Sequence, residues 1–311
     1  MEIHQGIENL PKFRNPVITT GTMDGVHLGH LKIIQCLREE AQKSEGESIV
    51  FTLWPHPRIV LYPEDNQLRL LNTLDERMNL LSKAGVEHLI ICPFTKKFSR
   101  LTSLQFIRDI LLQKIGARKL IVGYDHHFGR NRSGSYEDLK KLSTGLGFEL
   151  FRVTQQLVKN TPVSSTKIRI ALEKGQIEKS NEMLGYDFSF TGKVTEGKKV
   201  GATIGFPTAN IEIAETYKMI PADGVYNVKI RIDDKMFYGM LNIGFRPTLY
   251  GQNRTIEVHL LDFAENIYGK TLTVFVSKIL RKEKKFENVQ KLKEQLMLDE
   301  KETREFFIKG K

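Results

Sequence analysis

The chain has 311 residues, enough for two domains of ordinary size, and 40% of them are hydrophobic and 27% charged. No apolar run reaches the roughly 18 residues of a membrane span, and the N-terminus lacks the pattern of a secretory signal. The 47 basic and 37 acidic residues give a net charge of +10, but the basic residues are scattered and select no partner. Because Cys36 and Cys92 share no metal-ligand spacing, we expect reduced thiols and a cytoplasmic protein.

Strand-like and helix-like stretches alternate up to about residue 180. This alternation predicts an α/β fold with a mainly parallel sheet covered by helices. Ligands of such folds bind beyond the carboxyl ends of the strands, and several glycine-containing turns follow there. The expected strands are Val17–Thr20, Ser48–Leu53, His88–Cys92, Lys119–Val122 and Glu149–Val153.

The segment Gly21–His30 follows the first of these strands and precedes an apolar helical pattern. Its two histidines, His27 and His30, should share one face at the start of that helix, and the glycines leave the backbone bare. Free N–H groups and the helix dipole both favour anions, so the arrangement indicates a phosphate site. A helix cap or a core position is the usual role of a lone histidine there, but the strand, turn and helix around the pair argue against it.

Three segments of the first half resemble one enzyme family. Gly21–His30 resembles the His-x-Gly-His motif of class I nucleotidyltransferases, in the setting of bifunctional riboflavin kinase/FAD synthetases, with Met23 where Phe is usual. Ser164–Arg169 could be a simple helix cap, but it resembles the motif with which bacterial FAD synthetases embrace the phosphates of ATP. Gly123–Gly134 matches too, although His126 replaces an aromatic residue.

The resemblance implies that the first half adenylylates FMN, with positioning and charge stabilisation supplying most of the catalysis. It implies that His27 and His30 donate hydrogen bonds to the phosphate under attack. Asp125 would position adenosine or a metal ion. The other residues implied to bind ATP are Gly21, Asp24, Gly25, Gly29, Ser164, Thr166 and Arg169.

After Leu184 the pattern changes to short strands separated by glycine and proline. Their spacing suits a small antiparallel barrel, and the end of the chain, Glu287–Lys309, is helical. We therefore expect two domains, residues 1–183 and 184–311. The expected strands of the second are Phe188–Val194, Val225–Ile232, Met236–Asn242, Arg254–Phe263 and Thr271–Leu280.

The second half contains no P-loop, and its candidate phosphate site is Gly205–Asn210. In an extended stretch Thr208 and Asn210 point the same way and offer two oxygen ligands suited to Mg²⁺. A turn is the alternative role. The segment resembles the Gly-x-Pro-Thr-Ala-Asn motif of riboflavin kinases, whose catalytic domain is a small β-barrel. Gly205, Pro207 and Arg246 are then implied to bind ATP or flavin.

Alternation over Thr255–Leu260 places Glu257 on the face opposite the apolar residues, where a charge usually meets solvent. The resemblance makes Glu257 instead the general base that accepts the proton of the terminal ribityl hydroxyl. One departure is Ala202, which stands where an Arg is common, and Lys198 or Lys199 could supply that charge.

Taken together, the motifs resemble a bifunctional riboflavin kinase/FAD synthetase with a Rossmann-like nucleotidyltransferase domain. Riboflavin, FMN, FAD and ATP are then the expected ligands, with Mg²⁺ as cofactor, no nucleic acid or membrane, and a monomeric or weakly homo-oligomeric state. One alternative keeps the fold but only one activity. Another is an RNA-binding protein related to class I tRNA synthetases, although no long basic stripe with interleaved aromatic residues appears.

Overall fold

The computed structural model describes residues 1–64, 68–124, 135–197, 200–248 and 251–309, without the side chains of residues 200, 246–248, 251–253 and 309. The chain divides into two compact units, Met1–Ser165 and Thr166–Lys311, and each is built around its own sheet. Over the described ranges, no helix is both long and apolar enough to cross a bilayer.

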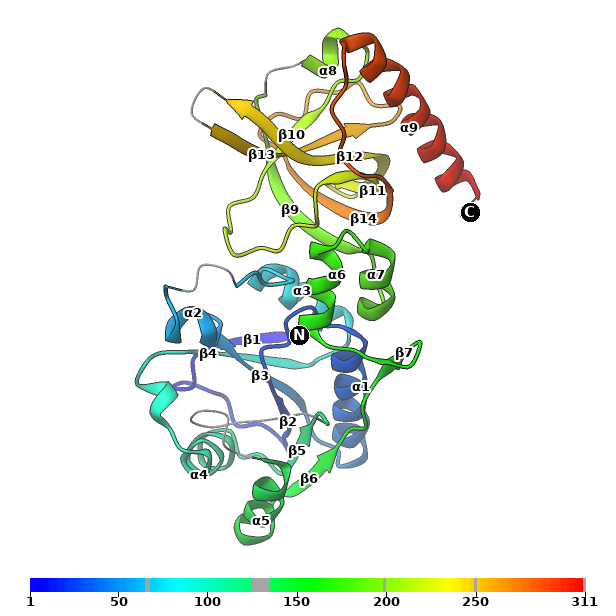
Figure 1. Cartoon of the computed structure of the whole chain (residues 1–311). Coiled ribbons are helices and arrows are strands. Elements are labelled where there is room, and N and C mark those ends of the chain that lie inside the picture. Colours follow the sequence, from blue (N-terminus) through cyan, green and yellow to red (C-terminus); the bar gives the residue numbers. More distant parts are fainter. Residues whose placement is uncertain (65–67, 125–134, 198–199, 249–250, 310–311) are drawn as a thin grey trace. The chain divides into compact units, whose positions relative to one another are not determined.

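The first unit is a six-stranded sheet in the order β1-β4-β3-β2-β5-β6, in which every neighbouring pair is parallel (Figure 1). Two further strands of two residues each, β7 and β8, follow in the chain and pair with each other antiparallel. The elements of this unit are β1 (Glu2–Gln5), β2 (Val17–Thr20), α1 (Leu28–Lys43), β3 (Ser48–Trp54), α2 (Pro57–Leu61), α3 (Leu74–Lys83), β4 (His88–Pro93), η1 (Phe98–Arg100), α4 (Ser103–Gln105), η2 (Phe106–Lys114), β5 (Lys119–Val122), α5 (Tyr136–Leu146), β6 (Glu149–Arg152), β7 (Leu157–Val158) and β8 (Thr161–Pro162).

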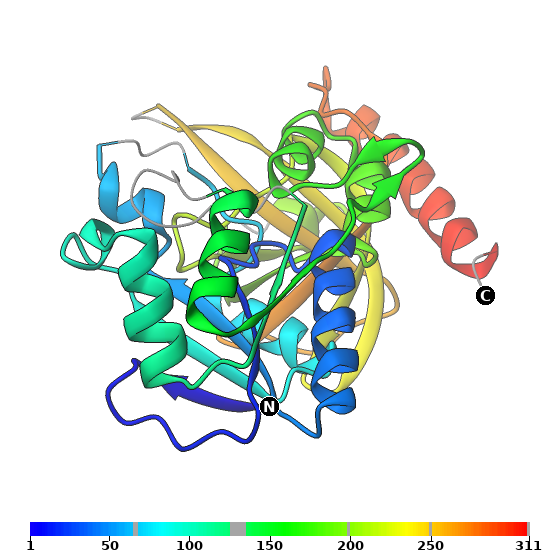
Figure 2. The ribbon, with the colours of Figure 1, turned by 90° about the horizontal axis from the view of Figure 1, so that it is seen from below.

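Helices cover both faces of this sheet because successive strand residues point to opposite sides (Figure 2). One apolar cluster joins the strands to α1 and α3, through Ile34 and Leu81 among others. The other joins them to η2 and α5, through Ile110 and Leu139. With both faces buried, the carboxyl ends of the strands are left as the open edge for a ligand.

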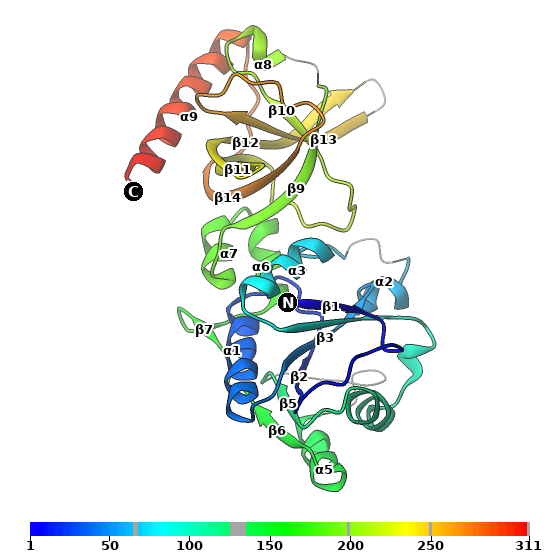
Figure 3. The ribbon, with the colours of Figure 1, turned by 180° about the vertical axis from the view of Figure 1, so that it is seen from behind.

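The second unit contains a closed antiparallel barrel in the order β10-β13-β12-β11-β14-β9. Helix α9 packs on the outside of β12 and β14 (Figure 3). Asn181 of the preceding helical segment donates to the carbonyl of Val276, which ties that segment to the barrel. The elements are α6 (Ser165–Glu173), α7 (Ile177–Leu184), β9 (Phe188–Thr195), α8 (Val200–Thr203), β10 (Ala209–Glu212), β11 (Gly224–Ile232), β12 (Lys235–Thr248), β13 (Gly251–Leu260), β14 (Thr271–Arg281) and α9 (Val289–Lys309).

The predicted fold class is confirmed in both units. Four short strands escaped prediction from the sequence: β1 and β10, which have four residues each, and β7 and β8, which have two. Strand β1 lies at the edge of the sheet and is mostly exposed, so its residues carry no apolar pattern. Strands β1 and β10 nevertheless contribute polar side chains that matter below.

Candidate functional site

The loop between β2 and α1 lies at the carboxyl edge of the parallel sheet. It is anchored to the neighbouring strand because the N–H of Gly21 donates to the carbonyl of Phe51 at 3.1 Å. Three of its residues have positive φ: Met23 at 48°, Gly25 at 91° and Val26 at 35°. Glycine adopts this conformation freely, whereas a methionine and a β-branched valine are strained in it. The loop therefore needs support from its surroundings.

The two histidines of the loop and helix lie against each other. The rings of His27 and His30 stack with centroids 3.7 Å apart and planes at 14°. His27 is the N-cap of α1, and its Nδ1 accepts the backbone N–H of His30 at 3.3 Å. A Cβ at Gly29 would come within 3.1 Å of the His27 ring, so the glycine leaves room for this stacking. The sequence predicted a shared face, and the structure brings the two rings into contact.

The environment of His30 favours an uncharged ring. Burial, followed by the nearby His27 and Arg77, holds the pKa of His30 well below its usual value of 6.5. Within the described residues, its buried Nδ1 has no hydrogen-bond partner. A neutral imidazole keeps one N–H, so at a helix N-terminus it can still donate a hydrogen bond to an anion.

Asp24 is buried beneath the loop, with only 1% of its surface exposed. Its carboxylate accepts the backbone N–H groups of Leu71, at 2.9 Å, and Asn72, at 3.2 Å. The guanidinium of Arg77 lies 3.9 Å from the same carboxylate and 5.4 Å from the centroid of Trp54. Arg77 is fully buried, and no sequence pattern pointed to it, since arginine is almost never buried. Asp24 thus joins the loop to the segment before α3.

Replacing Asp24 with asparagine should destabilise the first unit by about 1.5–3 kcal/mol, because hydrogen bonds to a charged acceptor are worth about that much. Asparagine keeps one oxygen that can accept a hydrogen bond, but its NH₂ group would face the backbone N–H groups of Leu71 and Asn72, which are donors themselves. Chemical denaturation measures the change. Asp109→Asn is the control, because its exposed carboxylate pairs with the exposed Arg108, and such surface pairs contribute little to stability. Equal effects of both substitutions would contradict the structural role of Asp24.

The Ser164–Arg169 segment begins helix α6 beside the same loop. The hydroxyl of Ser165 donates to the backbone carbonyl of Asp24 at 2.8 Å, and Ser164 is half-buried just before the helix. Thr166, which is exposed, and Arg169, which is half-buried, belong to the second unit, so their place relative to the histidines stays a prediction. Asp125 and the departure at His126 lie outside the described residues.

On the barrel, Glu257 belongs to a polar row that crosses three strands. It pairs in register with Asn210 of β10 and with Asn242 of β12, so the three side chains share one face. This is the outer face, because the neighbouring residues Val258 and Leu241 point into the barrel core. Only 4% of Glu257 is nevertheless exposed. An outer-face carboxylate that solvent does not reach must be covered by another segment.

The described part of residues 195–208 supplies that cover. The hydroxyl of Thr208 donates to Oε2 of Glu257 at 3.1 Å. His259 donates from Nδ1 to the carbonyl of Pro207 at 2.8 Å, and its ring contacts that of Phe206. A Cβ at Gly197 would overlap the amide of Asn210. The described residues between β9 and β10 therefore pack against the polar row formed by Asn210, Asn242 and Glu257.

Oxygen donors gather at this place, as a magnesium site needs. The hydroxyl of Thr208, the carboxylate of Glu257 and the amide of Asn210 are hard ligands, so the residues present fit Mg²⁺. Gly205 and Pro207 are exposed on the covering segment. The backbone of Arg246 lies in β12, while its side chain is outside the described set. Ala202 is exposed in α8, and the neighbouring Lys198 and Lys199 lie outside the described residues.

Two family models cover most of the chain. Residues 10–167 match the model described as FAD synthetase, and residues 184–307 match the model described as riboflavin kinase. A bifunctional riboflavin kinase/FMN adenylyltransferase of Listeria monocytogenes is 38% identical over 95% of this chain and 93% of its own length. The Escherichia coli K12 protein of the same name is 35% identical over 99% and 98%. The chain belongs to the bifunctional riboflavin kinase/FMN adenylyltransferase family.

A solved structure matches this riboflavin kinase/FMN adenylyltransferase family member over nearly its whole length. It is titled a macrolide-efflux protein from Streptococcus pneumoniae, is 29% identical, and covers 98% of this chain and 99% of its own with a TM-score of 0.89. The paired histidines lie within the FAD synthetase match, and the polar row lies within the riboflavin kinase match. An enzyme of this family uses ATP in both domains, with riboflavin, FMN and FAD as its flavin substrates and products.

Proposed function

We propose that this chain phosphorylates riboflavin on its barrel and adenylylates the resulting FMN on its parallel sheet. The observation that supports this best is that one chain holds two separate polar clusters, one in each family match: the stacked His27 and His30, and the Thr208–Glu257 pair. We place the domain boundary near residue 184, where the riboflavin kinase match begins.

In the adenylylation step an oxygen of the FMN phosphate attacks the α-phosphorus of ATP, and pyrophosphate leaves. His27 and His30 donate hydrogen bonds to the α-phosphate as negative charge builds up on it, and this role is supported by their contact at a helix N-terminus. Such a step needs little covalent help from the protein, because in-line positioning and charge stabilisation lower most of the barrier.

The remaining residues of this site divide into nucleotide contacts and supports. Ser164, Thr166 and Arg169 bind the β and γ phosphates, and Asp125 positions adenosine or a metal ion. Gly21, Gly25 and Gly29 let the backbone approach the nucleotide. The carboxylate of Asp24 acts on the loop instead, since it is buried against backbone N–H groups.

In the kinase step the terminal ribityl hydroxyl of riboflavin gives its proton to Glu257, its oxygen attacks the γ-phosphorus of ATP, and ADP leaves. The hydrogen bond from Thr208 holds the carboxylate in place, and burial keeps water from competing for it. Gly205, Pro207 and Arg246 contact ATP or flavin from the covering segment and β12. Mg²⁺, held by Thr208 and Asn210, would offset the charge of the phosphates.

Incubation with riboflavin, ATP and Mg²⁺ tests both activities at once. Chromatography should resolve FMN first and FAD later, with one ADP formed for each riboflavin phosphorylated and one pyrophosphate for each FAD. Formation of FMN without FAD would support the alternative in which only the kinase activity is retained. If riboflavin is not converted but added FMN is converted to FAD, only the adenylyltransferase activity is retained. If neither flavin nucleotide forms, the proposed function is wrong.

Removal of divalent cations should stop riboflavin phosphorylation, because the phosphate charge at Thr208 and Asn210 is then unscreened. Addition of Mg²⁺ alone after chelation should restore it. Thr208→Ala should raise the Mg²⁺ concentration at half-maximal kinase rate, while Thr191→Ala, in β9 of the same barrel, serves as a matched control. Kinase activity that survives complete chelation would contradict the magnesium role.

We further propose that the protein acts in the cytoplasm as a monomer or weak homo-oligomer, without nucleic acid or membrane. The scattered basic residues support this, since nucleic-acid sites concentrate them. A salt titration of RNA binding tests the alternative, because phosphate-driven affinity falls steeply as salt rises.

A further inference from the structure

Glu2, His4 and His88 form a cluster at the edge of the parallel sheet, away from the loop described above. Glu2 and His88 are the first residues of β1 and β4 and pair in register, and His4 lies two residues along β1. In parallel strands, register partners and residues two apart share one face, so all three side chains lie together. The paired histidines of the nucleotide site follow the opposite, carboxyl ends of the strands.

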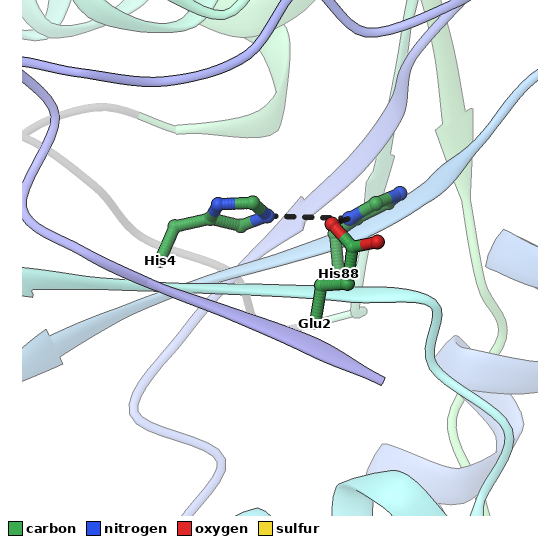
Figure 4. A group of neighbouring side chains, drawn as sticks. All are labelled: Glu2, His4 and His88. Carbon is green, nitrogen blue, oxygen red and sulfur yellow. Dashed lines mark hydrogen bonds and ion pairs between the residues drawn. The ribbon is translucent and has the colours of Figure 1, made fainter.

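The ligand atoms of the cluster converge (Figure 4). Nε2 of His4 lies 3.2 Å from Nδ1 of His88, and Oε2 of Glu2 lies 3.6 Å from the same Nδ1. One ligand atom from each residue lies within 4.8 Å of the others. Among the described residues, no other group of three or more such side chains meets this condition.

The separations of 3.2 and 3.6 Å are close to those between two ligands of a tetrahedral metal site. Zinc binds imidazole nitrogen and carboxylate oxygen at about 2.0–2.2 Å, which puts two ligands of a tetrahedron about 3.3–3.6 Å apart. Two imidazoles and one carboxylate favour a transition metal over Mg²⁺, which takes oxygen ligands. We propose that Glu2, His4 and His88 bind one Zn²⁺ ion, with the fourth position open to water.

The surroundings of the histidines suit this role. Phe13 packs edge-on against both rings, with centroids 5.5 Å from His4 and 5.1 Å from His88, and so fixes their orientation. A direct hydrogen bond between His4 and His88 would also explain their 3.2 Å separation. A measurement of metal binding distinguishes the two explanations.

A metal at this position would join the edge of the sheet to its neighbour. Strand β1 pairs only with β4 and has four residues, most of them exposed. Ligands from both strands make the ion a cross-link between them, and binding to the folded form alone raises its stability. The site therefore has a structural function, separate from both transfer reactions.

The full chain, stripped of metal, should bind Zn²⁺ in a competition titration against a coloured chelator, and its unfolding temperature should rise by several degrees. His4→Gln and His88→Gln should each weaken this binding by about tenfold or more, at least as much as outer-shell changes do. Excess Mg²⁺ should not displace the ion. Cobalt in place of zinc should give the visible absorption of a tetrahedral site, lost in both variants.

Two substitutions serve as controls. His56→Gln removes a half-buried histidine outside the cluster, and Glu8→Gln removes an exposed carboxylate that pairs with Lys114. Both should leave the zinc affinity and the temperature shift unchanged. Circular dichroism checks folding, and His4→Gln on the exposed edge strand carries the test if His88→Gln fails to fold. Zinc binding of equal strength in wild type and in the His4, His88 double variant would overturn the proposal, as would equal loss in His56→Gln.

Discussion

Replacing His30 with alanine should abolish FAD formation from FMN and ATP, while FMN formation from riboflavin continues near the wild-type rate. The substitution removes the ring that stacks on His27 at 3.7 Å, and with it the hydrogen-bond donor that we propose for the α-phosphate. Loss of one preorganised donor costs about 10²–10³ in rate. The stacked partner also loses its orientation, so we expect a decrease at or beyond the upper end of that range.

Separate assays make this result specific. Supplied FMN with ATP measures the release of pyrophosphate, and supplied riboflavin with ATP measures the formation of FMN before any adenylylation. Gln35→Ala is the matched control on α1, since Gln35 is exposed and its amide donates to the exposed Glu39 of the same helix. FAD synthesis near the wild-type rate in His30→Ala would refute the assignment, and equal loss of both activities would indicate misfolding instead.

The second large effect is expected from Glu257→Gln, which should lower riboflavin phosphorylation by about 10²–10⁴, the usual contribution of a general base. Glutamine keeps the size of the side chain and an oxygen that can accept the Thr208 hydroxyl, but it cannot take a proton. Adenylylation of supplied FMN should be unchanged, because that site lies in the other family match.

Glu212→Gln provides the comparison for this variant. Glu212 is an exposed carboxylate on β10, two residues along the same strand from Asn210. Glu212→Gln removes one negative charge, as Glu257→Gln does, but leaves the buried Thr208–Glu257 hydrogen bond in place. If Glu257→Gln keeps its kinase rate, or if both variants lose the same fraction, Glu257 is not the base.

The sequence was most informative where a local pattern determines geometry. Alternation placed Glu257 and His259 on one face of a strand, and the regular register of β13 with β12 confirms it. The strand, turn and helix around His27 and His30 likewise predicted that the two histidines would share one face, and their rings stack. Both predictions depend only on the periods of strand and helix, which the chain carries within a few residues.

Features that depend on distant segments could not be predicted in this way. Nothing in the pattern of β13 shows that Glu257 is covered, since that burial requires a contact with Thr208, which lies 49 positions away in sequence. Arg77 gave no signal either, because its burial beside Asp24 and Trp54 joins three separate parts of the chain. The four-residue β1 was missed because its partner strand, β4, is distant in sequence: His4 and His88 are 84 positions apart.

The strained loop before α1 has a consequence for how nucleotide affinity is set. Met23 and Val26 keep their left-handed conformations because the carboxylate of Asp24 is held by backbone N–H groups and its carbonyl by Ser165. Protein atoms alone fix this backbone, so the conformational entropy of ordering it is lost on folding rather than on association. Substitutions in the supporting segments should therefore weaken ATP binding without removing a single contact to the nucleotide.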